Sequence, residues 1–255
     1  MSATLHKLPV YRVVGLSWLH IIRHKFDFLR LGGLWFLIPI TMAALSPLVD
    51  GNANPWYRGI ETAIAYLAGL IVARAWIRHV LLHERASGPA KLNAGAIRYL
   101  LWNPALIVLA AVPAAPAIGY AMFGTQPTYV GLAKFVAILI AVPFVVRLAL
   151  VFAPVAIGYA GSKLEAGWQA GRGSWLRLLA AFMLVAVSGY VVTLLLVIPI
   201  GTIIMAADPS AALPDHPSLK VVDHLLTLLF VGLTSGLIAW SWKALTEGEA
   251  ALPTA

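Results

Sequence analysis

Long apolar stretches separated by short polar connections dominate the hydrophobic pattern of this chain. A hydrocarbon core about 30 Å thick is crossed by roughly 20 apolar residues of helix. The pattern therefore predicts an all-α, polytopic membrane helix bundle with six transmembrane helices, at about Leu31–Val49, Ile60–Leu82, Tyr99–Phe123, Val130–Phe152, Leu176–Ile200 and Val221–Trp242.

Two shorter segments have an interfacial pattern instead. In residues 9–30, apolar side chains such as Trp18 and Ile21 interleave with Arg23 and Lys25, which predicts an N-terminal amphipathic helix on the membrane surface. Ser162-Lys-Leu-Glu165 forms a capping box and predicts a short cytoplasmic interfacial helix near 162–170. We therefore divide the chain into a cytoplasmic amphipathic segment (1–30), a six-helix transmembrane domain (31–243) and a short cytoplasmic tail (244–255).

Composition excludes a water-soluble globule. Of the 255 residues, 61% are hydrophobic and 11% are charged, against roughly 45–50% and about 25% in soluble domains. The chain has no cysteine, which excludes a disulfide scaffold, a thiolate metal site and a cysteine nucleophile.

The net charge of +8 follows the predicted topology rather than a nucleic-acid surface, so no nucleic-acid partner is expected. All Lys and Arg residues except Arg58, Lys134 and Lys220 fall in the N-terminal segment, the connections on its side, the adjoining span ends or the C-terminal tail. Because basic residues in short loops stay in the cytoplasm, we expect both termini to be cytoplasmic. The predicted location is a bacterial inner membrane.

The predicted spans contain several prolines, among them Pro39, Pro104, Pro113, Pro143 and Pro199. Each removes an intrahelical hydrogen bond that a neighbouring group must replace in lipid. Two interpretations stay open: ordinary kinked packing, or broken helices that line a substrate cavity as in transporters.

Few residues suggest chemistry. Glu61 and Asp223 lie at the outer ends of their spans, and no acidic residue falls in the middle of any predicted span, which weakens ion-coupled transport. His79 and His83 share one helical face, but their order is not that of the His-Glu-x-x-His metalloproteases. We interpret both as imidazoles at headgroup level.

On the outer side, a loose acidic and histidine group lies in or beside a connection: Asp208, Asp215, His216, Asp223 and His224. It is interpreted as a solvated loop, because its Pro-Ser-Ala spacing fixes no ligand geometry. With no catalytic motif visible, we expect no enzymatic activity, catalytic residue, metal or cofactor.

Two stretches resemble a group of bacterial six-span membrane proteins related to the membrane domain that accompanies some glycerophosphodiester phosphodiesterases. They are Ala73-Arg-Ala-Trp-Ile-Arg78-His-Val-Leu-Leu-His-Glu84, and Arg147 through Pro154 followed by Leu164 through Leu178. The chain departs from the pattern at Ile77, His79, His83 and Gly171, and it carries no phosphodiesterase domain. The resemblance implies that Arg78, Glu84, Arg147, Trp168 and Arg177 are tied together on the cytoplasmic side, with Glu84 paired to an arginine.

The leading functional hypothesis is a non-enzymatic accessory or scaffold protein. Its basic cytoplasmic face would engage anionic membrane lipids or a membrane protein partner. The alternative is a transporter or permease for a lipid-like or amphiphilic solute, suggested by the prolines and by arginines within the spans. The sequence carries no signal for an oligomeric state. The structural or lipid-binding candidates are Arg74, Arg78, Glu84, Arg147, Trp168, Arg172 and Arg177.

Overall fold

The described part of the chain is built from helices and their connections. The computed structural model describes residues 7–49, 54–118, 127–207 and 216–253, and no strand occurs among them. Five helical stretches are long and apolar enough to cross a membrane: Lys25–Val49, Pro55–Leu82, Leu132–Ile157, Trp175–Ala207 and Pro217–Glu247. The prediction of an all-helical, multi-pass membrane protein is confirmed at this level.

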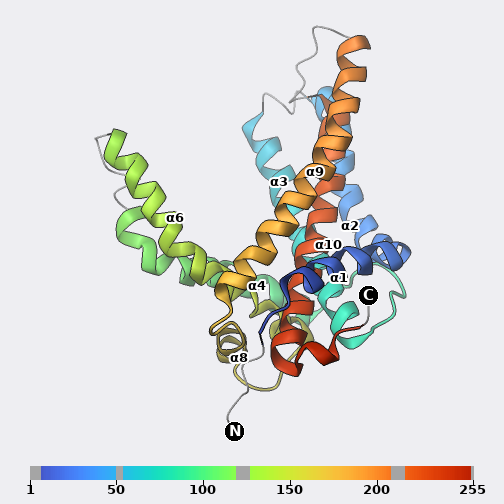
Figure 1. Cartoon of the computed structure of the whole chain (residues 1–255). Helices are drawn as coiled ribbons and strands as arrows, with labels where there is room; N and C mark the ends of the chain where they lie inside the picture. The colour runs from blue at the N-terminus through green and yellow to red at the C-terminus, as the bar shows by residue number, and fades with distance from the viewer. Residues whose placement is uncertain (1–6, 50–53, 119–126, 208–215, 254–255) are drawn as a thin grey trace.

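The α-helices follow the order of the predicted segments (Figure 1). They are α1 (Val10–Arg23), α2 (Lys25–Leu45), α3 (Pro55–Leu82), α4 (Ala94–Ala111), α6 (Pro127–Ala149), α7 (Phe152–Ile157), α8 (Lys163–Ala170), α9 (Trp175–Ala207) and α10 (Pro217–Glu247). Short 3-10 helices η1 (Ser46–Val49), η2 (Val112–Ala114) and η4 (Glu249–Ala251) extend α2, α4 and α10.

The third predicted span differs from the observed helix. The α-helix α4 ends at Ala111, and η2 follows immediately. Pro113 accounts for the missing α-helical hydrogen bond at this point, because it has no amide hydrogen to donate, although Val112 before it keeps α-helical backbone angles. The predicted span continues to Phe123, but residues 119–126 lie outside the described part of the chain.

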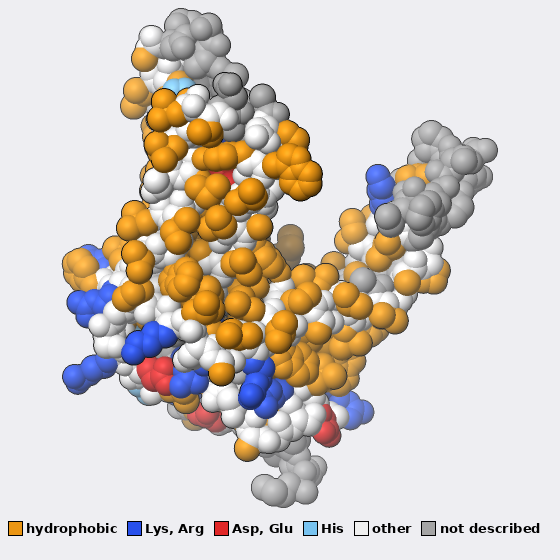
Figure 2. All heavy atoms as spheres, turned by 180° about the vertical axis from the view of Figure 1, so that it is seen from behind, with side chains coloured by type: hydrophobic (Ala, Val, Ile, Leu, Met, Phe, Trp, Pro, Cys, Tyr) orange, Lys and Arg blue, Asp and Glu red, His pale blue; other side chains and the backbone are white. Residues whose placement is uncertain are grey.

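The helices form two arms that share one base (Figure 1). Helices α2, α3 and α10 pack together in one arm, and α9 leans on α10 and on α1. Helices α4 and α6 pack against each other and form the second arm. The arms separate away from the end that carries α1, α8 and both chain termini, and Figure 2 shows the open space between two largely apolar surfaces.

Glycine allows close packing within the first arm. A Cβ atom on Gly232 of α10 would lie 2.6 Å from the ring of Phe28 and 2.9 Å from Cδ1 of Ile21. Both of those side chains are buried, with 4% and 7% exposure. The α10 backbone therefore lies close to the α1–α2 junction, and a larger residue at this position would displace the Phe28 and Ile21 side chains.

The amphipathic helix predicted over residues 9–30 is shorter in the structure: α1 ends at Arg23, and residues 25–30 belong to the first long helix, α2. Helix α1 contributes to the core. Val13 and Leu16 are buried, and Nε1 of Trp18 donates a hydrogen bond to Oγ of Ser188 in α9 at 3.0 Å. Arg12 donates to Oε1 of Glu249 at 3.2 Å and to the carbonyl of Leu252 at 3.1 Å. The N-terminal helix therefore holds the C-terminal tail.

The short helix predicted near 162–170 is α8. Its N-cap is Ser162, whose Oγ accepts a hydrogen bond from the amide of Glu165 at 3.4 Å, as the capping-box pattern predicts. That α1 and α8 lie at the membrane surface stays a prediction.

Candidate functional site

The connection between α3 and α4 folds back onto α2. Nη1 of Arg30 donates to the carbonyl of Ala86 at 2.9 Å, and Nε1 of Trp35 donates to the carbonyl of Ala90 at 2.7 Å. The amide of Ala90 in turn donates to the carbonyl of Leu31 at 3.0 Å. These three bonds hold residues 83–93, which have no regular secondary structure, against α2. We call this connection the docked loop.

A pocket of about 300 Å³ lies where the docked loop, α2 and α3 meet. Its charged lining consists of four cations and one carboxylate, so the lining has a net positive charge: Arg74, Arg78, Arg85, Lys91 and Glu84. We call this the basic pocket. It brings together three of the residues selected from the sequence and adds two cations from the docked loop.

The predicted pairing of Glu84 with an arginine is confirmed. Nε of Arg78 donates to Oε2 of Glu84 at 2.9 Å, and Nη2 of Arg78 pairs with Oε1. Nη1 of Arg78 also donates to the carbonyl of Ala156 in α7 at 3.1 Å. Arg78 therefore joins the end of α3, the docked loop and α7, and it balances the charge of Glu84.

Arg74 lies one helical turn deeper in α3. Its guanidinium extends toward Gly95 of α4, where a Cβ atom would clash with Nη2. Its Nε atom is buried and has no hydrogen-bond partner among the described residues. A buried, charged donor without a partner is costly, and an anionic oxygen in the basic pocket would supply one.

A second pair of predicted residues forms a separate contact. The guanidinium carbon of Arg147 lies 3.6 Å from the ring centroid of Trp168, and Nη2 donates to the Trp168 carbonyl at 3.2 Å. Arg172, in the turn after α8, and Arg177, in the first turn of α9, are exposed. The candidates from the sequence thus divide between the basic pocket, this cation–π contact and the surface.

Trp168 also faces an apolar pocket of about 450 Å³ between α4, α6 and α8. Leu109, Pro113, Phe144 and Leu164 line it together with the indole ring. This pocket has the size and apolar character that suit a hydrocarbon chain.

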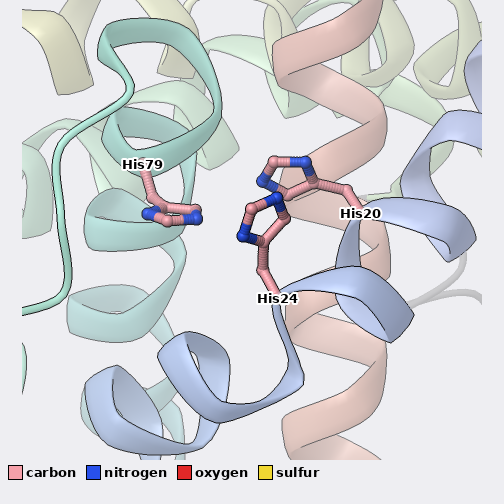
Figure 3. Close-up of side chains that lie close together, drawn as sticks. All are labelled: His20, His24 and His79. Atoms are coloured by element: carbon pink, nitrogen blue, oxygen red, sulfur yellow. The ribbon is translucent and has the colours of Figure 1, made fainter.

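Three histidines meet where α1, α2 and α3 approach one another (Figure 3). Each of His20, His24 and His79 offers a ring nitrogen, and these atoms lie within 4.8 Å of one another. Burial, with the nearby His24, His79 and His83, lowers the pKa of His20 to about 3, so its imidazole is neutral at pH 7. We call these three residues the histidine cluster.

Sequence reasoning missed the histidine cluster, although a signal was present. His20 and His24 are four residues apart, the same spacing that drew attention to His79 and His83. In the structure His79 turns toward the first pair, whereas His83 is exposed at the end of α3 with a φ of 53°.

A buried acid–histidine pair was also missed. Nε2 of His224 in α10 lies 2.8 Å from Oε1 of Glu61 in α3, and each side chain is 10% exposed. The sequence placed both residues near the outer end but could not pair them, since 163 positions separate them.

The Glu61–His224 pair borders a groove along α3 and α10. Its lining is mostly apolar, and we call it the polar groove after the polar side chains that it contains. Two adjoining cavities of about 450 and 470 Å³ share Thr62, Asp223 and His224 in their linings. The inner cavity also contacts Tyr66, whose hydroxyl donates a hydrogen bond to Oδ1 of Asn103. This polar groove lies on helices that are predicted to cross the membrane.

The remaining outer candidates do not gather into a site among the described residues. Nδ1 of His216 accepts a hydrogen bond from the amide of Ser218 at 3.3 Å and caps α10. Asp208 and Asp215 lie outside the described part of the chain.

Comparison of the chain with protein-family models, curated proteins and solved structures finds no match.

Proposed function

We propose that this chain is a non-enzymatic accessory or scaffold protein of the bacterial inner membrane that binds anionic lipid headgroups through the basic pocket. The observation that carries the proposal is the net positive lining of that pocket, with Arg74 at its inner end. Basic pockets between membrane helices on the cytoplasmic side are typical sites for anionic headgroups. As part of the same proposal, the chain is related to the six-span bacterial membrane proteins that residues 73–84, 147–154 and 164–178 resemble.

The distribution of charge supports this assignment. Lys and Arg side chains gather around the base of the two arms, whereas hydrophobic side chains cover much of the arms (Figure 2). With the base on the cytoplasmic side, both termini are cytoplasmic and α4, continued past Pro113, is the sixth crossing. Each cation near an anionic leaflet adds about 1 kcal/mol of attraction.

The donor geometry suits a phosphodiester. A guanidinium presents several N–H groups in one plane and binds two phosphate oxygens at once. Glu84 is held by Arg78, so the remaining cations of the pocket, Arg74, Arg85 and Lys91, face the incoming anion with little competition from that carboxylate.

The test is lipid retention by the full chain. The protein is purified in nanodiscs of phosphatidylcholine containing a minor fraction of phosphatidylglycerol, and the lipids that stay bound are counted by native mass spectrometry. We expect the double variant Arg74→Gln/Arg85→Gln to retain roughly 10-fold less phosphatidylglycerol, since each lost cation weakens binding.

The matched control is Arg98→Gln, which removes an exposed cation of α4 outside the lining of the basic pocket. It should retain phosphatidylglycerol like the wild type. Equal retention by all three proteins would refute headgroup binding in the basic pocket. A second polypeptide that copurifies in fixed ratio and is lost in the double variant would instead assign the pocket to a protein partner.

The polar groove favours a second candidate, a transporter or permease for a lipid-like or amphiphilic solute. Ionisable residues within a membrane segment are functional hypotheses by default because their burial is costly, and Glu61 and His224 are buried beside this groove. In proteoliposomes that contain a fluorescent phosphatidylglycerol analogue, wild-type protein should move the analogue between leaflets. Loss of movement in Glu61→Gln, with headgroup retention unchanged, would assign transport to the groove.

A further inference from the structure

We propose that the histidine cluster, His20, His24 and His79, is a binding site for a divalent transition-metal ion of the Zn²⁺ class that clips α1 to α3. His79 also lines the basic pocket, but the inference does not rest on headgroup binding there. The three residues come from α1, from the junction between α1 and α2, and from the last turn of α3 (Figure 3).

The placement of the rings is close to what Zn²⁺ requires. The ligand atoms lie within 4.8 Å of one another. Tetrahedral Zn²⁺ holds nitrogen at about 2.0–2.1 Å, which places two ligand nitrogens about 3.4 Å apart. Small ring rotations of His20 and His24 would close the remaining distance.

A ring nitrogen in this cluster lacks a partner. Nε2 of His20 is buried and has no hydrogen-bond partner among the described residues. Buried polar atoms in proteins are normally satisfied, and one that is not calls for an explanation. A metal ion at the centre of the cluster would satisfy it.

The other two rings each have an oxygen nearby, and the one beside His79 is within hydrogen-bonding distance. Nδ1 of His79 lies 2.6 Å from the backbone carbonyl of Glu84. Because a carbonyl only accepts hydrogen bonds, Nδ1 carries a proton, which leaves Nε2 as the nitrogen that would bind a metal. Oδ2 of Asp27 lies 3.6 Å from Nδ1 of His24. Backbone carbonyls and carboxylates behind the ring are the usual supports of metal-binding histidines.

The donor set indicates the class of ion. Neutral imidazoles suit Zn²⁺, Cu²⁺ and Ni²⁺, whereas Mg²⁺ and Ca²⁺ prefer oxygen. Three protein ligands leave one position for water or an exogenous ligand. Aromatic packing is the competing explanation, because His79 stacks on Trp76 at 5.0 Å and His20 lies edge-on to Trp240 at 5.6 Å between centroids.

Titration with Zn²⁺ separates the two explanations. The full chain, expressed without a polyhistidine tag, is treated with a chelator in phosphatidylcholine nanodiscs and then titrated in a calorimeter. We expect one Zn²⁺ per chain. His24→Ala should weaken binding by roughly 100-fold, since one of three protein ligands is lost. Co²⁺ should give the visible absorption of a tetrahedral nitrogen site in wild type only.

Two controls keep the test decisive. The His24 side chain is 43% exposed, so His24→Ala should fold, and its melting temperature without metal should match that of the wild type. His83→Asn removes the neighbouring exposed histidine and retains a residue that tolerates positive φ, so it should bind Zn²⁺ like the wild type. Wild-type affinity in His24→Ala, or equal loss in His83→Asn, would overturn the assignment.

A distance measurement tests the clip itself. Because the chain has no cysteine, the exposed residues Tyr11 of α1 and Leu82 of α3 can be replaced by cysteine and spin-labelled. Zn²⁺ should narrow the distribution of distances between the labels in an otherwise wild-type chain and leave it unchanged when His24→Ala is added. If Zn²⁺ leaves the distance distribution unchanged in both proteins, the proposal that the ion clips α1 to α3 is refuted.

Discussion

Arg78 is the residue through which the docked loop, α3 and α7 depend on one another. It bonds the Glu84 carboxylate and the Ala156 carbonyl. The side chains of Arg78 and Glu84 are 23% and 47% exposed, so solvent screens part of their attraction.

Glu84→Gln should therefore lower the free energy of unfolding by about 1 kcal/mol or less, as expected for a half-exposed ion pair. Arg78→Gln should cost more, because it also frees the carbonyl of Ala156. Denaturant titration in nanodiscs measures both. Glu247→Gln, at an exposed position near the end of α10, is the control and should be neutral. A neutral Glu84→Gln would mean that the pair adds nothing to stability.

The Glu61–His224 pair should behave as a coupled unit. Glu61→Leu and His224→Leu each leave the other buried group without its partner, at a cost of about 1–3 kcal/mol. The double variant should cost less than the two singles together, with a coupling energy of about 0.5–3 kcal/mol. A double-mutant cycle in nanodiscs measures this, and strict additivity would show that the contact carries no energy.

At the scale of elements, hydrophobic length predicted the long helices well. Six spans were predicted, and among the described residues five stretches of 25 to 33 residues are long and apolar enough to cross. The bilayer sets a minimum length of about 20 residues and requires every backbone group to be hydrogen-bonded within the segment. The effect of each proline on its helix was harder to predict, because the sequence allows both kinked and broken helices. Pro39, Pro143 and Pro199 lie inside continuous helices, whereas the helix before Pro113 ends.

Three residues of the basic pocket, Arg74, Arg78 and Glu84, could be chosen from the sequence, because basic residues at helix ends follow the positive-inside rule and the resemblance implied an acidic partner. That these residues lie together in one pocket could not be predicted from the sequence. The docked loop is fixed by bonds from Arg30 and Trp35, which are more than 50 positions away. The histidine cluster likewise depends on how α1 crosses α3, and periodicity in the sequence does not encode a crossing between distant helices.

Helix α8 is held close to α7 by Gly167. A Cβ atom at this position would lie 2.6 Å from Cα and 2.7 Å from the backbone nitrogen of Val151. Gly167→Ala must therefore shift the backbone and should destabilise the protein by about 1–3 kcal/mol. Gly33→Ala, in α2 with nothing within 4 Å, should be neutral or stabilising. Melting temperatures in nanodiscs compare them, and equal values would contradict the close contact.

At the scale of the molecule, the two arms differ in how they are held. Helices α2, α3 and α10 all pack on one another, whereas the described parts of α4 and α6 separate from the first arm away from the base (Figure 1). Regions with few tertiary contacts move more, so the second arm should sample a range of positions relative to the first.

Spin labels on cysteines introduced at exposed Leu139 of α6 and Leu195 of α9 should therefore give a broad distance distribution in nanodiscs. Labels at exposed Tyr66 of α3 and Leu225 of α10 should give a narrow one, since both helices belong to the first arm. Equally narrow distributions would show that the second arm is rigidly held.

Because the two arms join at one base, the space between them opens toward one side of the molecule only, and this affects which leaflet its lipids would come from. The space between the arms is closed where the basic end joins them and open at the far end (Figure 2). With the arms crossing the bilayer as proposed, hydrocarbon tails would enter the space between them from the monolayer opposite the basic end. In a bilayer whose two monolayers contain different lipids, the space between the arms would then contact lipids of one monolayer and the basic pocket those of the other. A single chain would thus sample both monolayers through separate surfaces.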